Sequence, residues 1–306
     1  MANLKKLPLV ISIIALFSFI ATAKAEIKVV TSIKPIHSLA SYIMDGVGSP
    51  DVIVDGYSSP HSFQLKPSHA KMLENADIIF WIGEGLENFL EKPLDSISKN
   101  AKKVELMEIK GINKLEFREK NIFNEHDHDE HKHEEDGHKE EHDEHEHEED
   151  GHNEVKHDDH VGHDDLGHGE HDPHIWLDPQ NAKVMVKLIT KELSELDLKN
   201  APTYKKNSEK ALSDLDKLIK KVKKDTNKDY RFVVFHDAYH YYEDRFGIKL
   251  LGALTVNPDV LPGAEQLAEI REVIEHEKVN CIFSEPQFNP DIINQSLKIQ
   301  VLKLAF

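Results

Sequence analysis

The sequence of 306 residues contains a single cysteine, Cys281, so no internal disulfide can cross-link the fold. It also lacks the zinc-protease pattern H-E-x-x-H, a glycine-rich phosphate loop and the G-x-S-x-G turn of serine hydrolases. These absences leave the common hydrolase and nucleotide-binding classes without support from a motif.

Long hydrophobic runs are scarce as well. The uncharged apolar run, residues 7–20, follows Lys5 and Lys6 and falls short of the roughly 20 residues that span a bilayer as a helix. Small residues ending in Ala23-Lys24-Ala25 come next, which is the pattern of a signal-peptide cleavage site. We therefore predict a signal peptide over residues 1–25, cleaved near Ala25. No cysteine stands there to carry a lipid, so the mature protein is predicted to be free in a periplasm.

The sequence has fewer basic than acidic residues, and its formal net charge is −18. This negative charge argues against a nucleic-acid partner. Almost all of this charge lies in residues 125–172, where 22 Asp and Glu face 3 Lys. The segment has too few apolar residues to bury a core, so we predict a disordered insertion.

The insertion also contains 14 of the 21 histidines. Neutral imidazole suits zinc, copper and nickel, and carboxylates concentrate cations nearby, so weak and exchangeable metal binding is predicted there, with a purely solubilising loop as the alternative. The candidate low-affinity ligands are His126, His128, His131, His133, His138, His142, His145, His147, His152, His157, His160, His163, His168 and His171.

Strands and helices alternate on both sides of the insertion. Before it, strand patterns occur at residues 27–33, 51–55, 77–82 and 104–109, and helical patterns at 36–45, 67–75 and 86–98. After it, helical patterns cover 181–196 and 202–224, and a second series alternates strands at 232–235, 250–256 and 281–284 with helices at 238–246 and 263–278. A short helix is expected after Asn289.

Short strands that alternate with helices favour parallel sheets covered on both faces. We predict an α/β fold of two doubly wound lobes joined by a long rigid helix. The lobes are expected at residues 26–200 and 228–306, with the linker helix at 201–227. An ordinary surface helix is the alternative for that linker.

Three histidines outside the predicted insertion follow strand ends or strand-linking loops, where open α/β sheets bind ligands. His61 follows the second strand, His236 ends the first strand of the second lobe, and His174 lies in the D-P-H-I-W-L-D-P segment. Three imidazoles and one further ligand would satisfy tetrahedral zinc. On the residues alone, each is a candidate ligand.

Residues 59–68 (SPHSFQLKPS), 172–179 (DPHIWLDP) and 235–239 (FHDAY) resemble, in order, the signatures of high-affinity zinc-uptake solute-binding proteins of ABC transporters. The resemblance runs from about residue 27 to 297. It implies two lobes joined by a rigid helix, zinc held between them by His61, His174 and His236, and delivery to a membrane permease. A monomer is expected.

The sequence departs from that family at two places. Pro60 stands where some members carry a ligand glutamate, so water is the expected fourth ligand. At residues 298–306 the family continues through another strand and helix, so we expect an incomplete second lobe with exposed core surface. Some members of the family have a second cysteine in this further strand and helix.

His240, four residues after His236, and Glu285, at a strand end, are candidate auxiliary metal ligands. Two other functions stay open. Three histidine ligands with one open coordination position also occur in catalytic zinc centres, so a zinc hydrolase is one alternative. The other is a metal buffer without a transporter, in which the insertion is the functional element. We predict a zinc-binding protein and no enzyme.

Overall fold

The computed structural model describes residues 26–118, 120–123, 170–258, 262–279, 281–288 and 304–305. The predicted signal peptide, nearly all of the predicted insertion and the helix expected after Asn289 lie outside these residues. Within the described part of the chain, no helix combines the length and the apolar character that crossing a membrane requires.

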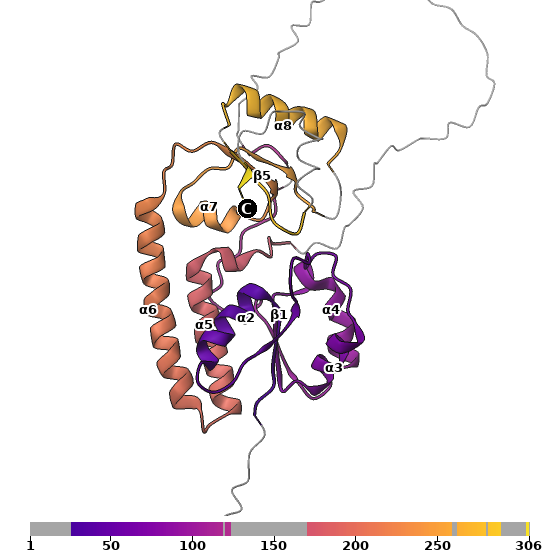
Figure 1. The fold of residues 1–306 in the computed structure, drawn as a ribbon, viewed down its shortest axis with the longest axis vertical. Helices are drawn as coiled ribbons and strands as arrows, with labels where there is room; N and C mark the ends of the chain where they lie inside the picture. The colour runs from indigo at the N-terminus through magenta and orange to yellow at the C-terminus, as the bar shows by residue number, and fades with distance from the viewer. Residues whose placement is uncertain are drawn as a thin grey trace, which may run out of the picture.

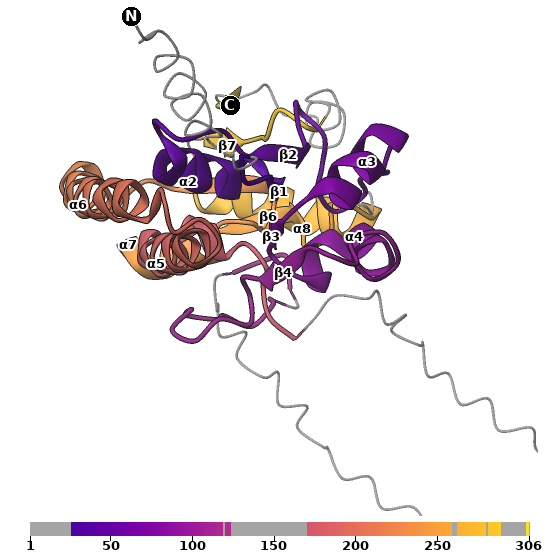
Figure 2. The ribbon, with the colours of Figure 1, turned by 90° about the horizontal axis from the view of Figure 1, so that it is seen from below.

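The first lobe is a parallel sheet with the strand order β2-β1-β3-β4. Its strands are β1 (Val29–Ile33), β2 (Asp51–Val54), β3 (Ile78–Trp81) and β4 (Lys102–Glu105). Helices α2 (Lys34–Met44), α3 (Pro67–Asn75) and α4 (Glu84–Ser96) connect them. Helices lie on both sides of the strands, with α2 on one side and α3 and α4 on the other (Figure 2). Because both faces are covered, β1 and β3 are buried at every position, and all their residues are apolar except Thr31 and Ser32 of β1.

The position of β4 differs from the prediction. The apolar pattern predicts a strand at residues 104–109, whereas β4 begins at Lys102 and ends at Glu105. Lys102 and Lys103 are exposed because β4 is the edge strand of the sheet, and an edge strand tolerates charge that a central strand excludes.

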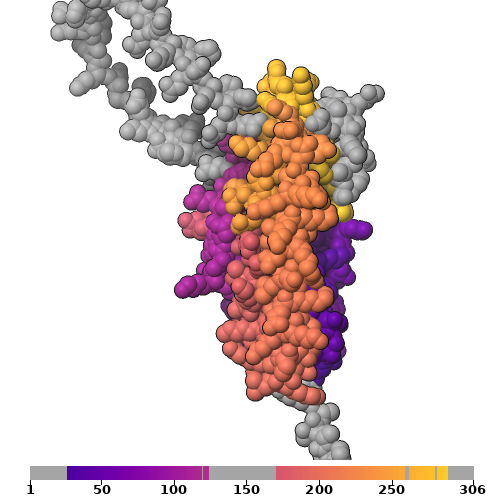
Figure 3. Space-filling model, turned by 90° about the vertical axis from the view of Figure 1, so that its left-hand side faces the viewer, coloured from indigo at the N-terminus to yellow at the C-terminus, as the bar shows by residue number. Residues whose placement is uncertain are grey.

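The long helical segment follows the insertion. A short 3₁₀ turn, η1 (Ile175–Leu177), leads into α5 (Pro179–Leu196), which packs antiparallel against α6 (Ala201–Asp225). The side chain of Asp178 caps α5 by accepting from the backbone N–H of Gln180 at 2.8 Å. α6 runs along one side of the molecule from the first lobe to the second (Figures 1 and 3).

Each end of α6 is held by a different lobe. Tyr204 and Ala211 are buried in the first-lobe core, while Ile219 packs with Phe246 and Ile248 of the second lobe. The solvent-facing positions are charged, as the sequence pattern indicates. α6 thus packs against both lobes.

The second lobe repeats the topology of the first, with the parallel strand order β6-β5-β7-β8. Its strands are β5 (Phe232–His236), β6 (Gly252–Thr255), β7 (Cys281–Phe283) and β8 (Leu304–Ala305), and its helices are α7 (His240–Phe246) and α8 (Ala264–His276). The α/β fold with parallel sheets is thereby confirmed. Residues 304–305, from the segment predicted to be the cut end of the lobe, form the fourth strand beside β7.

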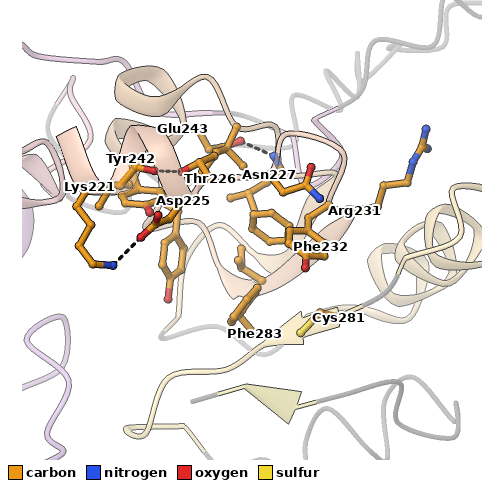
Figure 4. Close-up of a pocket in the computed structure, with 16 residues that line it drawn as sticks. Lys221, Asp225, Thr226, Asn227, Arg231, Phe232, Tyr242, Glu243, Cys281 and Phe283 are labelled. Carbon is orange, nitrogen blue, oxygen red and sulfur yellow. Dashed lines mark hydrogen bonds and ion pairs between the residues drawn. The ribbon is translucent and has the colours of Figure 1, made fainter. Parts of the chain in front are cut away.

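A pocket of about 800 Å³ lies on the α7 side of the second sheet (Figure 4). Phe232, Val234 and Phe283 of the sheet line it, with Cys281 at one side and Lys221 of α6 at another. The second lobe accordingly has its buried side chains divided among small clusters, whereas the first lobe has one large core.

The chain crosses between the lobes just before the predicted insertion. Ile122 forms an antiparallel bridge with Gly252 of β6, and the N–H of Phe123 donates to the carbonyl of Leu251 at 3.1 Å. A Cβ at Gly252 would lie 2.6 Å from the carbonyl oxygen of Asn121, so glycine permits this close approach. Residues 121–123, inside the predicted first lobe of 26–200, therefore lie on the second.

Candidate metal centre

Three segments far apart in the sequence bring histidines to the junction of the lobes. His61 lies in the loop after β2, His174 immediately precedes η1, and His236 is the last residue of β5. Because parallel strands end at the same edge of a sheet, the loops after β2 and β5 open toward the gap between the two sheets.

The three rings surround a common point. Their centroids are 5.4 Å apart for His61 and His174, 5.8 Å for His61 and His236, and 5.4 Å for His174 and His236. One ring nitrogen from each lies within 4.8 Å of the other two. An ion at their centre would thus be at most about 2.8 Å from each nitrogen. Small rotations of the rings would bring the nitrogens closer to it, toward the usual Zn–N distance of about 2.0–2.1 Å.

Asp172 orients His174. Its Oδ1 lies 2.7 Å from Nδ1 of the ring and also accepts the backbone N–H of His174 at 2.9 Å. A carboxylate can only accept, so Nδ1 carries the proton and Nε2 keeps its lone pair for a metal. Asp172 was predicted to end the insertion, and this role beside His174 was not predicted. The Asp-Pro-His spacing is the one available signal, because an aspartate readily bonds the backbone two residues on.

One ring nitrogen of His236 has no hydrogen-bond partner. The residue is buried, Nδ1 faces the Glu285 carboxylate at 2.9 Å, and Nε2 is without a partner among the described residues. Leaving a buried polar atom unpaired costs about 1–3 kcal/mol, so such an atom in a native site calls for a partner. A cation at the centre of the three rings would supply one, and imidazole is a suitable ligand for zinc. The donor set fits this ion.

Charged side chains join the lobes next to the cluster. Arg118, which precedes the predicted insertion, pairs with Glu243 of α7, and its Nε lies 3.6 Å from Asp237 Oδ2. Burial raises the pKa of the Asp237 carboxyl to about 7, against the lowering effect of Arg118. Burial likewise raises the pKa of Glu243. A largely buried polar seam therefore lies beside the cluster, in which His174 and His236 are buried and His61 is half-buried.

Tyr241 adds a further link between the lobes. Its hydroxyl donates to the carbonyl oxygen of Asp172 at 2.7 Å and accepts the N–H of Leu115 at 3.0 Å. The ring is fully buried among first-lobe core residues although it belongs to α7. The backbone that carries Asp172 and His174 is thus anchored to the second lobe.

The other predicted ligands occupy different places. Among the described residues, no other His, Cys, Asp or Glu joins the three nitrogens in a mutually close group. His240 begins α7, and burial lowers the pKa of its imidazole. Glu285 lies beside His236 on the side of Nδ1, 2.9 Å away. Of the insertion histidines, His171 is described and bridges Glu116 in the backbone, while the others lie outside the described residues.

Comparison with protein families gives a match over most of the chain. Residues 29–299 match the family described as "Zinc-uptake complex component A periplasmic". The chain is 45% identical over 295 residues to the high-affinity zinc uptake system protein ZnuA of Brucella abortus, covering 96% of this chain and 86% of that protein. It is 36% identical to the protein of the same name from Yersinia pestis, over 90% of this chain and 80% of the relative.

Solved structures agree on the fold. A crystal structure of ZnuA superposes with a TM-score of 0.68 at 21% identity, covering 92% of this chain and 91% of that one. A Zn(II)-bound mutant variant of AdcAII from Streptococcus pneumoniae gives 0.64 at 23% identity, with 91% and 87% covered. At these identities the likeness concerns the fold alone.

Proposed function

Because the chain belongs to the family of periplasmic component A of zinc-uptake complexes, we propose that it captures zinc between its lobes and delivers it to the permease of an ABC transporter. His61, His174 and His236 would hold the ion, with water as the fourth ligand. The supporting observation is the convergence of three imidazole nitrogens, all within 4.8 Å of one another, from segments of both lobes.

The remaining features are consistent with this role. A signal peptide cleaved near Ala25 would place the protein in the periplasm, as a monomer. The histidines of residues 125–172 would bind further ions weakly. Zinc is the cargo in this proposal, so the site must release it, and an interface between two lobes can open as a unit more readily than a site inside one core.

A catalytic zinc centre is the alternative from another class. It would need a general base poised beside the open metal position. The carboxylates beside the three rings face the histidines or Arg118, since Asp172 bonds His174, Glu285 lies 2.9 Å from Nδ1 of His236, and Asp237 faces Arg118. This arrangement favours holding the ion over activating a water on it, and the family is one of transport proteins.

Zinc titration with a competing chelator tests the proposal. Wild-type protein is expected to show one tight site and several weak ones, and His61→Ala, His174→Ala and His236→Ala should each remove the tight site. His276→Ala, an exposed histidine at the end of α8, is the matched control and should leave it intact. Loss of the weak sites alone would instead support a metal buffer.

Delivery is tested in cells that lack their own zinc-uptake binding protein. The wild-type chain should restore growth under zinc limitation, and the His174→Ala chain should not. Zinc-dependent turnover of ester, peptide or phosphate substrates that His174→Ala abolishes would contradict the proposal in favour of a hydrolase.

A further inference from the structure

Glu285 stands directly behind one of the three histidines. The register of β5 and β7 pairs Val234 with Phe283, and continuing it by two residues sets His236 opposite Glu285. Side chains at facing positions of neighbouring strands point to the same face of a sheet. Accordingly, Glu285 Oε1 lies 2.9 Å from Nδ1 of His236, and both carboxylate oxygens are buried.

We infer that Glu285 is a positioning residue for His236. On zinc binding, the Nδ1–H of His236 donates to Glu285, which holds the Nε2 lone pair on the ion. This inference rests on the proposed function. Nδ1 of His236 and Oε1 of Glu285 lie 2.9 Å apart, within hydrogen-bond distance, while Nε2 has no partner among the described residues and stays available to the ion.

Two observations favour this role over direct ligation, for which Glu285 was also a candidate. The carboxylate oxygens do not join the mutually close group formed by the three imidazole nitrogens. They also face the ring nitrogen that a metal ligand normally leaves to an acceptor. A carboxylate in that place fixes the tautomer of the imidazole and makes its other nitrogen a stronger ligand.

The first lobe contains the same unit. Asp172 Oδ1 lies 2.7 Å from Nδ1 of His174, just as Glu285 Oε1 lies 2.9 Å from Nδ1 of His236. Each lobe therefore contributes one imidazole backed by a carboxylate. Such a pair favours zinc over manganese, since the stronger nitrogen donors suit zinc and manganese prefers oxygen.

The surroundings of Glu285 keep the carboxylate in place. It stands two residues after the end of β7, next to the buried Ser284, and its carbonyl accepts the N–H of Phe288 at 3.1 Å. Tyr239 is its neighbour, and burial together with the Glu285 charge raises the pKa of that phenol. Because the phenol of Tyr239 stays neutral, its hydroxyl can donate toward the Glu285 carboxylate and so stabilise the charged form of that carboxylate.

Glu285→Gln, Glu285→Ala and the control Glu269→Gln, at an exposed position of α8, test the inference in the full-length protein. We expect zinc affinity to fall about 10-fold in Glu285→Gln and toward 100-fold in Glu285→Ala, and to stay unchanged in the control. Circular dichroism and thermal unfolding of the metal-free proteins show whether each variant is folded.

A second measurement separates positioning from ligation and from simple loss of structure. Long-range ¹H–¹⁵N NMR of the zinc-loaded wild type should show His236 protonated at Nδ1 and coordinated through Nε2, and the cobalt-substituted Glu285→Gln protein should keep the visible spectrum of the wild type. An Nδ1 ligand, a changed cobalt spectrum or an affinity within twofold of wild type would each overturn the inference.

These outcomes are distinct from failure of the proposed function. If the wild type binds zinc tightly and Glu285→Gln binds it equally well, the inference alone is wrong. If the wild type lacks a tight site that depends on His174, both are wrong.

Discussion

Arg245 forms a bidentate ion pair with Asp178 across the junction of the lobes. Its Nε and Nη2 lie 2.7 and 2.6 Å from the two carboxylate oxygens. Arg245 belongs to α7 of the second lobe, and the fully buried Asp178 caps α5 four residues after His174. The start of α5 and the loop that carries His174 are thereby tied to the second lobe.

Replacing Arg245 with Leu should destabilise the protein by about 3–5 kcal/mol, because it leaves the buried charge of Asp178 without its partner. Urea unfolding of the metal-free protein measures the change. Lys221→Ala, which breaks the exposed pair with Asp225 on α6, is the control and should have little effect. Equal stability of the two variants would contradict a structural role for the Arg245 pair.

Glu87 should make stability depend on pH. The residue is fully buried at the start of α4, where one oxygen accepts the N–H groups of Ile82 and Gly83 at 3.0 Å, and burial raises its pKa to about 7. The folded protein then binds more protons than the unfolded chain between roughly pH 4.5 and 7, so its contribution to stability is lost as the pH rises through that window.

Glu87→Gln removes this loss. Relative to wild type, the variant should gain stability on the order of 1–3 kcal/mol between pH 4.5 and pH 8. Chemical denaturation of the metal-free proteins at several pH values measures the difference. Glu91→Gln, at an exposed position of the same helix, should run parallel to wild type throughout. If the stability of Glu87→Gln followed that of wild type at every pH, the pKa of the Glu87 carboxyl would be that of an ordinary glutamate.

The boundary of the insertion can be located by two deletions. Removing residues 125–169 should leave the tight zinc site and abolish the weak ones, because His61, His174 and His236 all lie outside that range. Extending the deletion through Asp172 should weaken the tight site about 10- to 100-fold, since His174 then loses the carboxylate on Nδ1. Isothermal titration of both proteins with zinc gives the comparison.

Asp172→Asn within the shorter deletion isolates the carboxylate from the change in chain length. Equal zinc affinity of this variant and its parent would mean that Asp172 does not act on the metal site.

Gly252→Ala should lower stability by about 1–3 kcal/mol, because the new methyl group would lie 2.6 Å from the carbonyl oxygen of Asn121. The bridge between Ile122 and Gly252 must shift to relieve the overlap. Thermal unfolding measures the cost, and amide exchange at Ala253, whose N–H donates to the Asn121 carbonyl at 2.9 Å, shows whether the bridge opens. An unchanged melting temperature would exclude a tight approach there.

Much of the fold follows from local patterns. Pro67 begins α3 at the predicted residue, because proline suits the first turn of a helix. The central strands β1 and β3 are mostly apolar, because both of their faces are buried. The edge strand β4 was placed wrongly for the opposite reason, since its exposed lysines imitate a loop. The antiparallel crossing of residues 121–123 onto β6 has no local signal.

The sequence singles out His61, His174 and His236 as candidate ligands, because each stands in a recognisable motif after a strand or before a helix. Their shared centre, and the carboxylates behind two of them, were decided by tertiary structure. Asp172 is a neighbour of His174 in the chain, but Glu285 faces His236 only through the register of β5 and β7. Patterns along a chain report burial and turn geometry locally, whereas a contact between distant residues depends on how whole strands align.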